Sequence, residues 1–135
     1  WILNQPEPSA IYRQLSWHIR APLNVAAMQT ALAAVVGRHD FASFEGAGSP
    51  RTSTIREVFV ADLCEQPGNF LRLEITANGF LRYMVRNIVG TLAEIGLGKR
   101  PAAAMPTVLA GRNRSLAGAT APPRGLFLAA VGYES

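Results

Sequence analysis

Residues 80–97, which read FLRYMVRNIVGTLAEIGL, predict the longest helix of the chain. The apolar side chains in this stretch recur at spacings of three and four residues, which is typical of a helix that buries one face. The residues of this apolar stripe are Leu81, Met84, Val85, Ile88, Leu92 and Ile95. Gly96 and Gly98 follow the stripe and are expected to end the helix.

Two stretches before this helix predict a β-hairpin. Residues 70–76 alternate polar and apolar side chains, which is typical of a half-buried strand. Residues 55–63 are rich in β-branched residues and predict a second strand. Between them, residues 66–69 read QPGN and carry several overlapping turn signals. We therefore expect the two strands to pair with each other.

The first part of the chain predicts a strand and a helix. Residues 11–19 mix aromatic and β-branched residues with polar ones and predict a strand, and the segment at Trp1 also reads as strand. Asn24 is expected to cap a helix whose apolar residues continue to Val35. Gly37 is expected to act as the C-cap of that helix.

The remaining segments complete an α+β domain. Residues 38–54 are expected to form a loop, residues 101–109 a shorter helix and residues 126–133 a last strand. The order is then β-α-β-β-α-(α)-β, which is typical of a ferredoxin-like domain whose antiparallel sheet carries helices on one face. A chain of 135 residues fits one such domain, covering residues 1–135.

The composition excludes several classes of protein. Hydrophobic residues make up 49% and charged residues 16% of the chain, which excludes a disordered protein. A single cysteine, Cys64, excludes a disulfide framework, and because the two histidines lie far apart, no metal site is expected. No apolar run approaches the roughly 18 residues of a membrane span, and no signal peptide begins the sequence. The sequence therefore predicts a soluble, cytoplasmic domain.

The charges are distributed unevenly along the chain. Thirteen basic residues, twelve of them arginine, stand against nine acidic ones and give a net charge of +4. Residues 1–67 carry five arginines and six acids, a net charge of −1, whereas residues 68–135 carry eight basic residues and three acids, a net charge of +5. Guanidinium groups suit phosphate, so a polyanionic partner of the second half is one interpretation. A solvated arginine-rich surface is the other.

The predicted long helix also carries an arginine pair beside its apolar stripe. Arg82 and Arg86 are four residues apart, so their charges repel by a few tenths of a kcal/mol. One turn further on, where an acidic residue could neutralise Arg86, the sequence has Gly90. The pair predicts that an external carboxylate or phosphate binds there, with a solvated helix face as the alternative.

Four blocks of the sequence resemble, in order, those of the tRNA pseudouridine synthase A family. They read GRHDFASF (residues 37–44), SPRT (residues 49–52), GFLRYMVRNIVGTL (residues 79–92) and RSLAGATAPPRGLFL (residues 114–128). The resemblance covers essentially the whole chain and implies half of the pseudouridine synthase fold. It also implies an isomerase that converts uridines of the tRNA anticodon arm to pseudouridine with an aspartate nucleophile and without cofactor or metal. The family works as a homodimer that holds tRNA across both subunits.

The resemblance assigns roles to individual residues. Arg86 matches the family arginine that pairs with the catalytic aspartate, and a nearby guanidinium would keep that carboxylate ionised. Leu126 matches a leucine that lines the uracil pocket, with an ordinary core position in a strand as the alternative. Arg51 and Arg82 are candidate phosphate contacts, with solvated surface as the alternative.

Other residues of the matching blocks are expected to be structural. Phe41 and Phe44 are expected in the core, in the block that shapes the loop after the first helix. Asn87 and Gly90 are expected to pack against the sheet rather than to take part in chemistry.

One part of the family pattern has no counterpart in this sequence. The family nucleophile lies in a GRTDxGVHA-type motif, and neither Asp40 nor Asp62 matches it. The chain is therefore expected to be the C-terminal half of such an enzyme, to act with its own N-terminal domain, and to be inactive alone. A stand-alone RNA-binding module is one alternative, although residues 70–76 offer a single aromatic where an RNA-recognition strand has several. A non-catalytic dimerisation domain is another, which the hydrophobic content supports only weakly.

Overall fold

The computed structural model describes residues 1–9, 15–46 and 53–127 as an α+β domain. Its strands are β1 (Ile2–Asn4), β2 (Trp17–Ile19), β3 (Gly37–Asp40), β4 (Ile55–Gln66) and β5 (Phe70–Ala77). Its α-helices are α1 (Val25–Ala33), α2 (Met84–Gly96) and α3 (Ala104–Gly111). Two 3-10 turns, η1 (Ala42–Phe44) and η2 (Arg114–Leu116), complete the described elements.

The five described strands form one sheet in the order β2-β1-β5-β4-β3. Strands β4 and β5 are the predicted hairpin, paired antiparallel from Gln66 opposite Phe70 to Val58 opposite Ala77. Strand β1 runs antiparallel to β5 but parallel to β2, so the sheet is mixed and the expected wholly antiparallel sheet is wrong.

The side chain of Asn4 stabilises this parallel pairing. Its amide nitrogen donates to the carbonyls of Ile19 and Ala21 at 2.9 and 2.7 Å, and its oxygen accepts from the Leu23 N–H at 3.1 Å. The chain that leaves β2 is therefore bound to the end of β1. Such bonds join residues far apart in sequence, so the spacing of apolar residues gave no sign of them.

The first helix is shorter than predicted, and a strand follows it. Asn24 caps α1 as predicted, because its side chain accepts from the Ala27 N–H at 3.1 Å. The helix ends at Ala33, and Gly37 begins strand β3 instead of acting as the C-cap. Residues expected to lie in a loop thus pair with β4, with Arg38 opposite Glu57. The four residues of this edge strand read GRHD and include no apolar or β-branched residue, so they show no alternation that would predict a strand.

Two other strand predictions fall partly on residues that the structure does not describe. Of residues 11–19, residues 17–19 form β2, and residues 11–14 lie outside the described ranges. Of the expected last strand, Leu126 and Phe127 are not in a strand, and residues 128–133 lie outside the described ranges.

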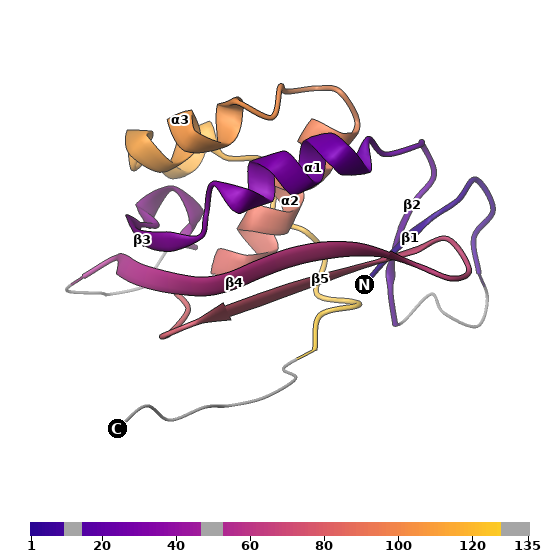
Figure 1. Cartoon of the computed structure of the whole chain (residues 1–135), viewed down its shortest axis with the longest axis horizontal. Coiled ribbons are helices and arrows are strands. Elements are labelled where there is room, and N and C mark those ends of the chain that lie inside the picture. Colours follow the sequence, from indigo (N-terminus) through magenta and orange to yellow (C-terminus); the bar gives the residue numbers. More distant parts are fainter. Residues whose placement is uncertain (10–14, 47–52, 128–135) are drawn as a thin grey trace.

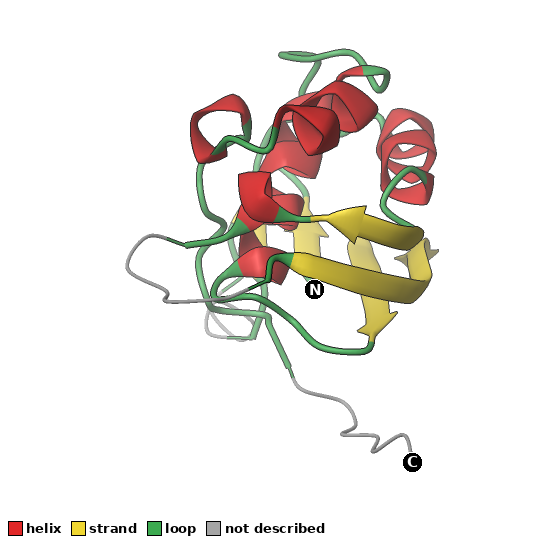
Figure 2. Cartoon of the chain, turned by 90° about the vertical axis from the view of Figure 1, so that its left-hand side faces the viewer, coloured by secondary structure: helices red, strands yellow, loops and turns green. Residues whose placement is uncertain are grey.

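The three α-helices lie on one side of the sheet, as expected (Figure 1). Figure 2 shows the same arrangement from the left-hand side of Figure 1, with helices above the strands. Helix α1 packs against both α2 and β4. Within the described residues, no helix is long and apolar enough to cross a membrane.

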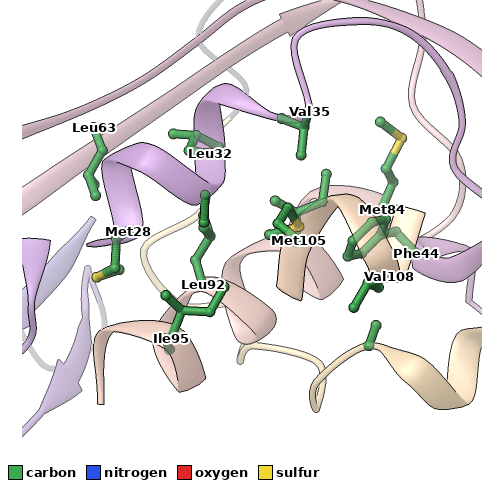
Figure 3. Close-up of a cluster of buried hydrophobic side chains, with 14 of the residues drawn as sticks. Met28, Leu32, Val35, Phe44, Leu63, Met84, Leu92, Ile95, Met105 and Val108 are labelled. Atoms are coloured by element: carbon green, nitrogen blue, oxygen red, sulfur yellow. The ribbon is translucent and has the colours of Figure 1, made fainter. Parts of the chain in front are cut away.

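The core lies between the helices and the sheet, where side chains of α1, α2, α3 and β4 meet (Figure 3). The predicted stripe of α2 is buried, except for the partly exposed Val85. Phe41 and Phe44 are completely buried, which confirms their predicted place in the core. The other completely buried side chains include Met28, Leu32, Met84, Ile88, Leu92 and Met105.

Gly90 lies on the face of α2 that contacts segment 117–121, not on the sheet side where it was expected. A Cβ at this position would overlap the carbonyl oxygen of Ala119, a backbone atom that cannot rotate away. The segment therefore approaches the helix backbone closely only because residue 90 is glycine.

Gly90→Ala tests this close approach. Replacing an exposed glycine inside a helix by alanine usually raises the free energy of unfolding by about 1 kcal/mol. At residue 90 we expect the free energy of unfolding to fall instead, by about 1–3 kcal/mol, because the added Cβ overpacks the contact with segment 117–121. Urea denaturation measures the change. Gly111→Ala, at the end of α3, is the matched control, because its Cβ would meet only the movable tip of the exposed Leu116 side chain. An increase in stability in Gly90→Ala would contradict the packing described.

Candidate functional site

The candidate site lies at the N-terminal end of α2, where Arg82 and Arg86 share one aromatic ring. The guanidinium carbon of Arg82 lies 4.9 Å and that of Arg86 4.8 Å from the ring centroid of Tyr83. Arg82 Nη2 also donates to the Tyr83 hydroxyl at 3.3 Å. Attraction between each cation and the ring offsets the repulsion expected from the four-residue spacing. The sequence had indicated an arginine pair without partners in the domain, and this is wrong, because both arginines contact Tyr83.

The backbone of Tyr83 has a conformation that tyrosine rarely adopts. Its φ of 59° lies in the left-handed region, where a bulky side chain costs of the order of 1–3 kcal/mol. This residue interrupts the helical conformation, which is why α2 begins at Met84 and not at residue 80 as predicted. A pattern of apolar spacing does not detect a single left-handed residue.

Gly46 supports the unusual conformation of Tyr83 from a distant part of the chain. Its N–H donates to the Arg82 carbonyl at 2.7 Å. A Cβ at Gly46 would lie 2.5 Å from Cδ2 of the Tyr83 ring. The ring therefore occupies space that a side chain at residue 46 would fill.

Arg86 is fixed by segment 117–121 as well as by the ring. Its Nε donates to the Ala121 carbonyl at 2.8 Å, and the Ala121 N–H donates to the Arg86 carbonyl at 3.0 Å. Across residues 1–9, 15–46 and 53–127, no acidic side chain forms an ion pair with Arg86. One edge of the guanidinium is thus bound to a neutral carbonyl, and no carboxylate of the described residues binds its two terminal nitrogens.

Asn87 connects the same segment to the core of the domain. Its side chain is fully buried and donates to the Phe44 carbonyl at 2.7 Å. Its oxygen accepts from the Thr120 hydroxyl at 2.6 Å and from Arg114 Nη2 at 3.1 Å. Asn87 therefore has a structural role, as expected, but its side-chain partners lie in η1, η2 and segment 117–121 and not in the sheet.

Two further polar residues of α2 hold the segment in place. Thr91 Oγ1 accepts from the Gly118 N–H at 2.9 Å, and Glu94 accepts from the Ala119 N–H at 3.2 Å. We call Asn87, Thr91 and Glu94 the polar stripe of α2. The binding of this segment was not predicted, although three polar residues at positions i, i+4 and i+7 of an apolar helix are a signal that the sequence contains.

The sequence-predicted site residues are only partly brought together. Arg82 and Arg86 meet at Tyr83, whereas Arg51 lies outside the described residues.

Leu126 is half exposed, which argues against the alternative of a core position in a strand. It follows Gly125, where a Cβ would lie 2.7 Å from the Trp1 carbonyl oxygen beside β1. The segment that binds Arg86 at Ala121 therefore continues to the edge of the sheet near β1 and β2.

The described residues offer no obvious metal centre. They contain no group of three histidine, cysteine, aspartate or glutamate side chains that could hold an ion. The chemical features of the site are instead two guanidinium groups, one of which is held in a fixed orientation, and an exposed phenol.

The fold and this arginine-bearing helix agree with a family of RNA-modifying enzymes. The family model described as tRNA pseudouridine synthase matches residues 31–134, which is most of the chain. This match places the chain among the tRNA pseudouridine synthases. The chain is also 42% identical to tRNA pseudouridine synthase A of Ruminiclostridium cellulolyticum, over 98% of this chain and 54% of that protein. It belongs to the tRNA pseudouridine synthase A family, which confirms the resemblance found in the sequence.

Other relatives give the same result and the same coverage. The identity is 47% to tRNA pseudouridine synthase A of Moorella thermoacetica, over 98% of this chain and 53% of the relative. It is 44% to that of Alcanivorax borkumensis, over 98% of this chain and 49% of the relative. The chain spans about half the length of the curated relatives it matches.

The two arginines also act on the phenol of Tyr83. The hydrogen bond from Arg82 lowers the pKa of Tyr83, and the positive charges of Arg82 and Arg86 lower it further, because all of them favour the phenolate. We therefore expect Arg82→Gln to raise the pKa of Tyr83, and Arg86→Gln to raise it less. An NMR titration of ¹³Cζ-labelled tyrosine measures both shifts, with Tyr83→Phe identifying the resonance. An unchanged pKa in Arg82→Gln would contradict the contact.

Proposed function

We propose that residues 1–135 form the C-terminal domain of a tRNA pseudouridine synthase that isomerises uridines of the anticodon arm. The observation that carries this proposal is how the Arg86 guanidinium is bonded within the domain. Its Nε is fixed by the Ala121 carbonyl, and no acidic side chain among the described residues pairs with its terminal nitrogens. A fixed guanidinium of this kind suits a carboxylate supplied from outside the domain. The names of the relatives support the same reaction.

The proposed partner of Arg86 is the aspartate nucleophile of the enzyme's own N-terminal domain. In the reaction, that carboxylate attacks C1′ of the ribose as the bond between C1′ and uracil N1 breaks and its electron pair stays on the uracil. The detached uracil rotates, and its C5 bonds to C1′ as the bond between C1′ and the carboxylate oxygen breaks and the carboxylate is released. The C5 proton is lost and N1 gains one, so the reaction is an isomerisation. A carboxylate must be ionised to act as a nucleophile, and a guanidinium beside it lowers its pKa. The terminal nitrogens of Arg86 can bind both carboxylate oxygens and so orient them.

Other residues are proposed to bind the RNA. Leu126 would form part of the apolar wall of the uracil pocket, which excludes water from the reacting bond. Arg82 and Arg51 would contact phosphates of the anticodon arm. The positive charge of residues 68–135 would attract tRNA before these contacts form. The intact enzyme is proposed to act as a homodimer, without a cofactor.

The 135-residue chain alone should show no pseudouridine synthase activity, because it has no residue that matches the family nucleophile. Tritium release from an unmodified tRNA transcript labelled at C5 of uridine measures this reaction. The full-length enzyme is the positive control. Turnover by the isolated chain above background would show that the proposed division between the two domains is wrong.

Substitutions of Arg86 in the full-length enzyme test its proposed role. Arg86→Ala removes both the charge and the fork that orients the carboxylate, so we expect kcat to fall about 100-fold or more. Arg86→Lys keeps a charge but not the fork, and should also lower kcat. Both changes should affect kcat far more than tRNA binding, as measured by steady-state kinetics and by direct binding.

Arg82→Ala is the matched control for this test. A phosphate contact contributes to binding, so its loss should raise KM, leave kcat nearly unchanged and reduce the salt dependence of binding by about one counterion. If Arg86→Ala behaved in this way too, Arg86 would be a phosphate contact. If Arg86→Ala had normal kinetics, the proposed role would be wrong.

A further inference from the structure

The backbone conformation of Tyr83 is not explained by the packing of the domain alone. Its side chain is 43% exposed, so it adds little to the core. Its backbone is nevertheless left-handed, at a φ of 59°. Among the described residues, the other non-glycine residues with positive φ are Asn69, in the β4–β5 turn, and Arg112, at the C-cap of α3. Those are ordinary places for this conformation, whereas the first residue before a helix is not.

The surrounding structure holds Tyr83 in this conformation from both sides. The Gly46 N–H binds the carbonyl of the preceding residue, Arg82, at 2.7 Å. The Tyr83 carbonyl accepts from the Asn87 N–H at 2.9 Å as the first bond of the helix. The absent side chain of Gly46 leaves room for the ring. Unfavourable backbone that is fixed in this way commonly serves a functional site.

The ring restrains Arg86 in a way that the carbonyl of Ala121 cannot. The bond from Nε to Ala121 fixes one edge of the guanidinium but allows the group to turn about that bond. The Tyr83 ring, 4.8 Å from the guanidinium carbon, supports the group from a second direction. Arg82 also lies against this ring, at 4.9 Å, and in addition donates to the Tyr83 hydroxyl, so the hydroxyl bond belongs to Arg82 and the ring contact is shared. Two separate contacts thus define how the terminal nitrogens of Arg86 point.

We infer that Tyr83 is a positioning residue, whose ring orients the Arg86 guanidinium toward the carboxylate that Arg86 binds. This inference rests on the proposed function of Arg86. Tyr83 itself takes no part in bond breaking or proton transfer. Its contribution is made through Arg86, and the contribution comes from the ring rather than from the hydroxyl.

Two substitutions of Tyr83 in the full-length enzyme separate the ring from the backbone. Tyr83→Gly removes the ring but accepts the left-handed conformation without strain, so the start of α2 should be retained. We expect its kcat to fall about 10-fold or more, with KM changed less than threefold and the melting temperature maintained. Tyr83→Phe keeps the ring and loses only the hydroxyl, so it should retain most of the kcat of the unmodified enzyme.

Gly46→Ala tests the same contact from the other side. Its Cβ would displace the Tyr83 ring, so kcat should fall although Tyr83 and Arg86 are both present. Gly79→Ala is the matched control, because its Cβ would lie 3.6 Å from the nearest atom of Arg56, an ordinary contact. Normal kcat in Gly46→Ala, together with normal kcat in Tyr83→Gly, would overturn the inference.

A second measurement uses the 135-residue chain and does not depend on activity. Relaxation of the ¹⁵Nε–Hε group of Arg86 reports how rigidly its guanidinium is held. The order parameter should fall in Tyr83→Gly and stay unchanged in Tyr83→Phe. An unchanged order parameter in Tyr83→Gly would overturn the inference.

The failure of this inference can be distinguished from the failure of the proposed function. If Tyr83→Gly keeps full kcat while Arg86→Ala loses it, Arg86 has its proposed role and the positioning by Tyr83 is wrong. If Arg86→Ala also keeps full kcat, the proposed function is wrong, and the inference falls with it.

Discussion

The contact between helix α2 and segment 117–121 determines the geometry of the candidate site, and it depends on the absence of a side chain at Gly90. Once the backbones are this close, the polar stripe of α2 can reach the N–H groups of Gly118 and Ala119. The next residue but one, Ala121, then exchanges two hydrogen bonds with Arg86. The helix is thus enclosed on two sides, by the apolar core and by a loop that it binds through polar groups.

No acidic side chain among the described residues neutralises the positive charges of Arg82 and Arg86. Residues 68–135 contain three acidic residues, and two of these, Glu74 and Glu94, pair with Arg72 and Arg100. Arg82 and Arg86 are left with a neutral ring and a neutral carbonyl as partners. Neutral partners fix the direction of a guanidinium without cancelling its charge. The site therefore keeps its attraction for an anion while holding a defined shape.

Local patterns in the sequence predicted the elements that depend on local interactions. The β4–β5 hairpin, the Asn24 cap, the buried stripe of α2 and the core positions of Phe41 and Phe44 are examples. The parallel pairing of β1 with β2 and the short edge strand β3 were missed, because both depend on contacts between distant residues.

The same distinction applies to the candidate site. Arg82 and Arg86 were recognised from spacing and from family blocks, which are properties of one helix. The support of Tyr83 by Gly46, and the binding of Thr120 and Phe44 by Asn87, join residues that lie far apart in the chain. No spacing rule within the helix could have predicted the start of α2 at Met84, since that depends on a left-handed tyrosine held from residue 46.

The binding of segment 117–121 to α2 also sets how much of the time Arg86 is aligned. The N–H groups of Gly118, Ala119 and Ala121, the Thr120 hydroxyl and the Ala121 carbonyl each bond to α2, and a net contribution of about 1 kcal/mol per bond would give the segment an opening free energy of about 5 kcal/mol. Each 1.4 kcal/mol changes a population tenfold, so the open state would be populated of the order of 0.1% of the time or less. Arg86 would therefore be aligned in nearly all molecules at any moment. Only a variant that lost about four of these five bonds would leave Arg86 without its Ala121 partner in a substantial fraction of the molecules.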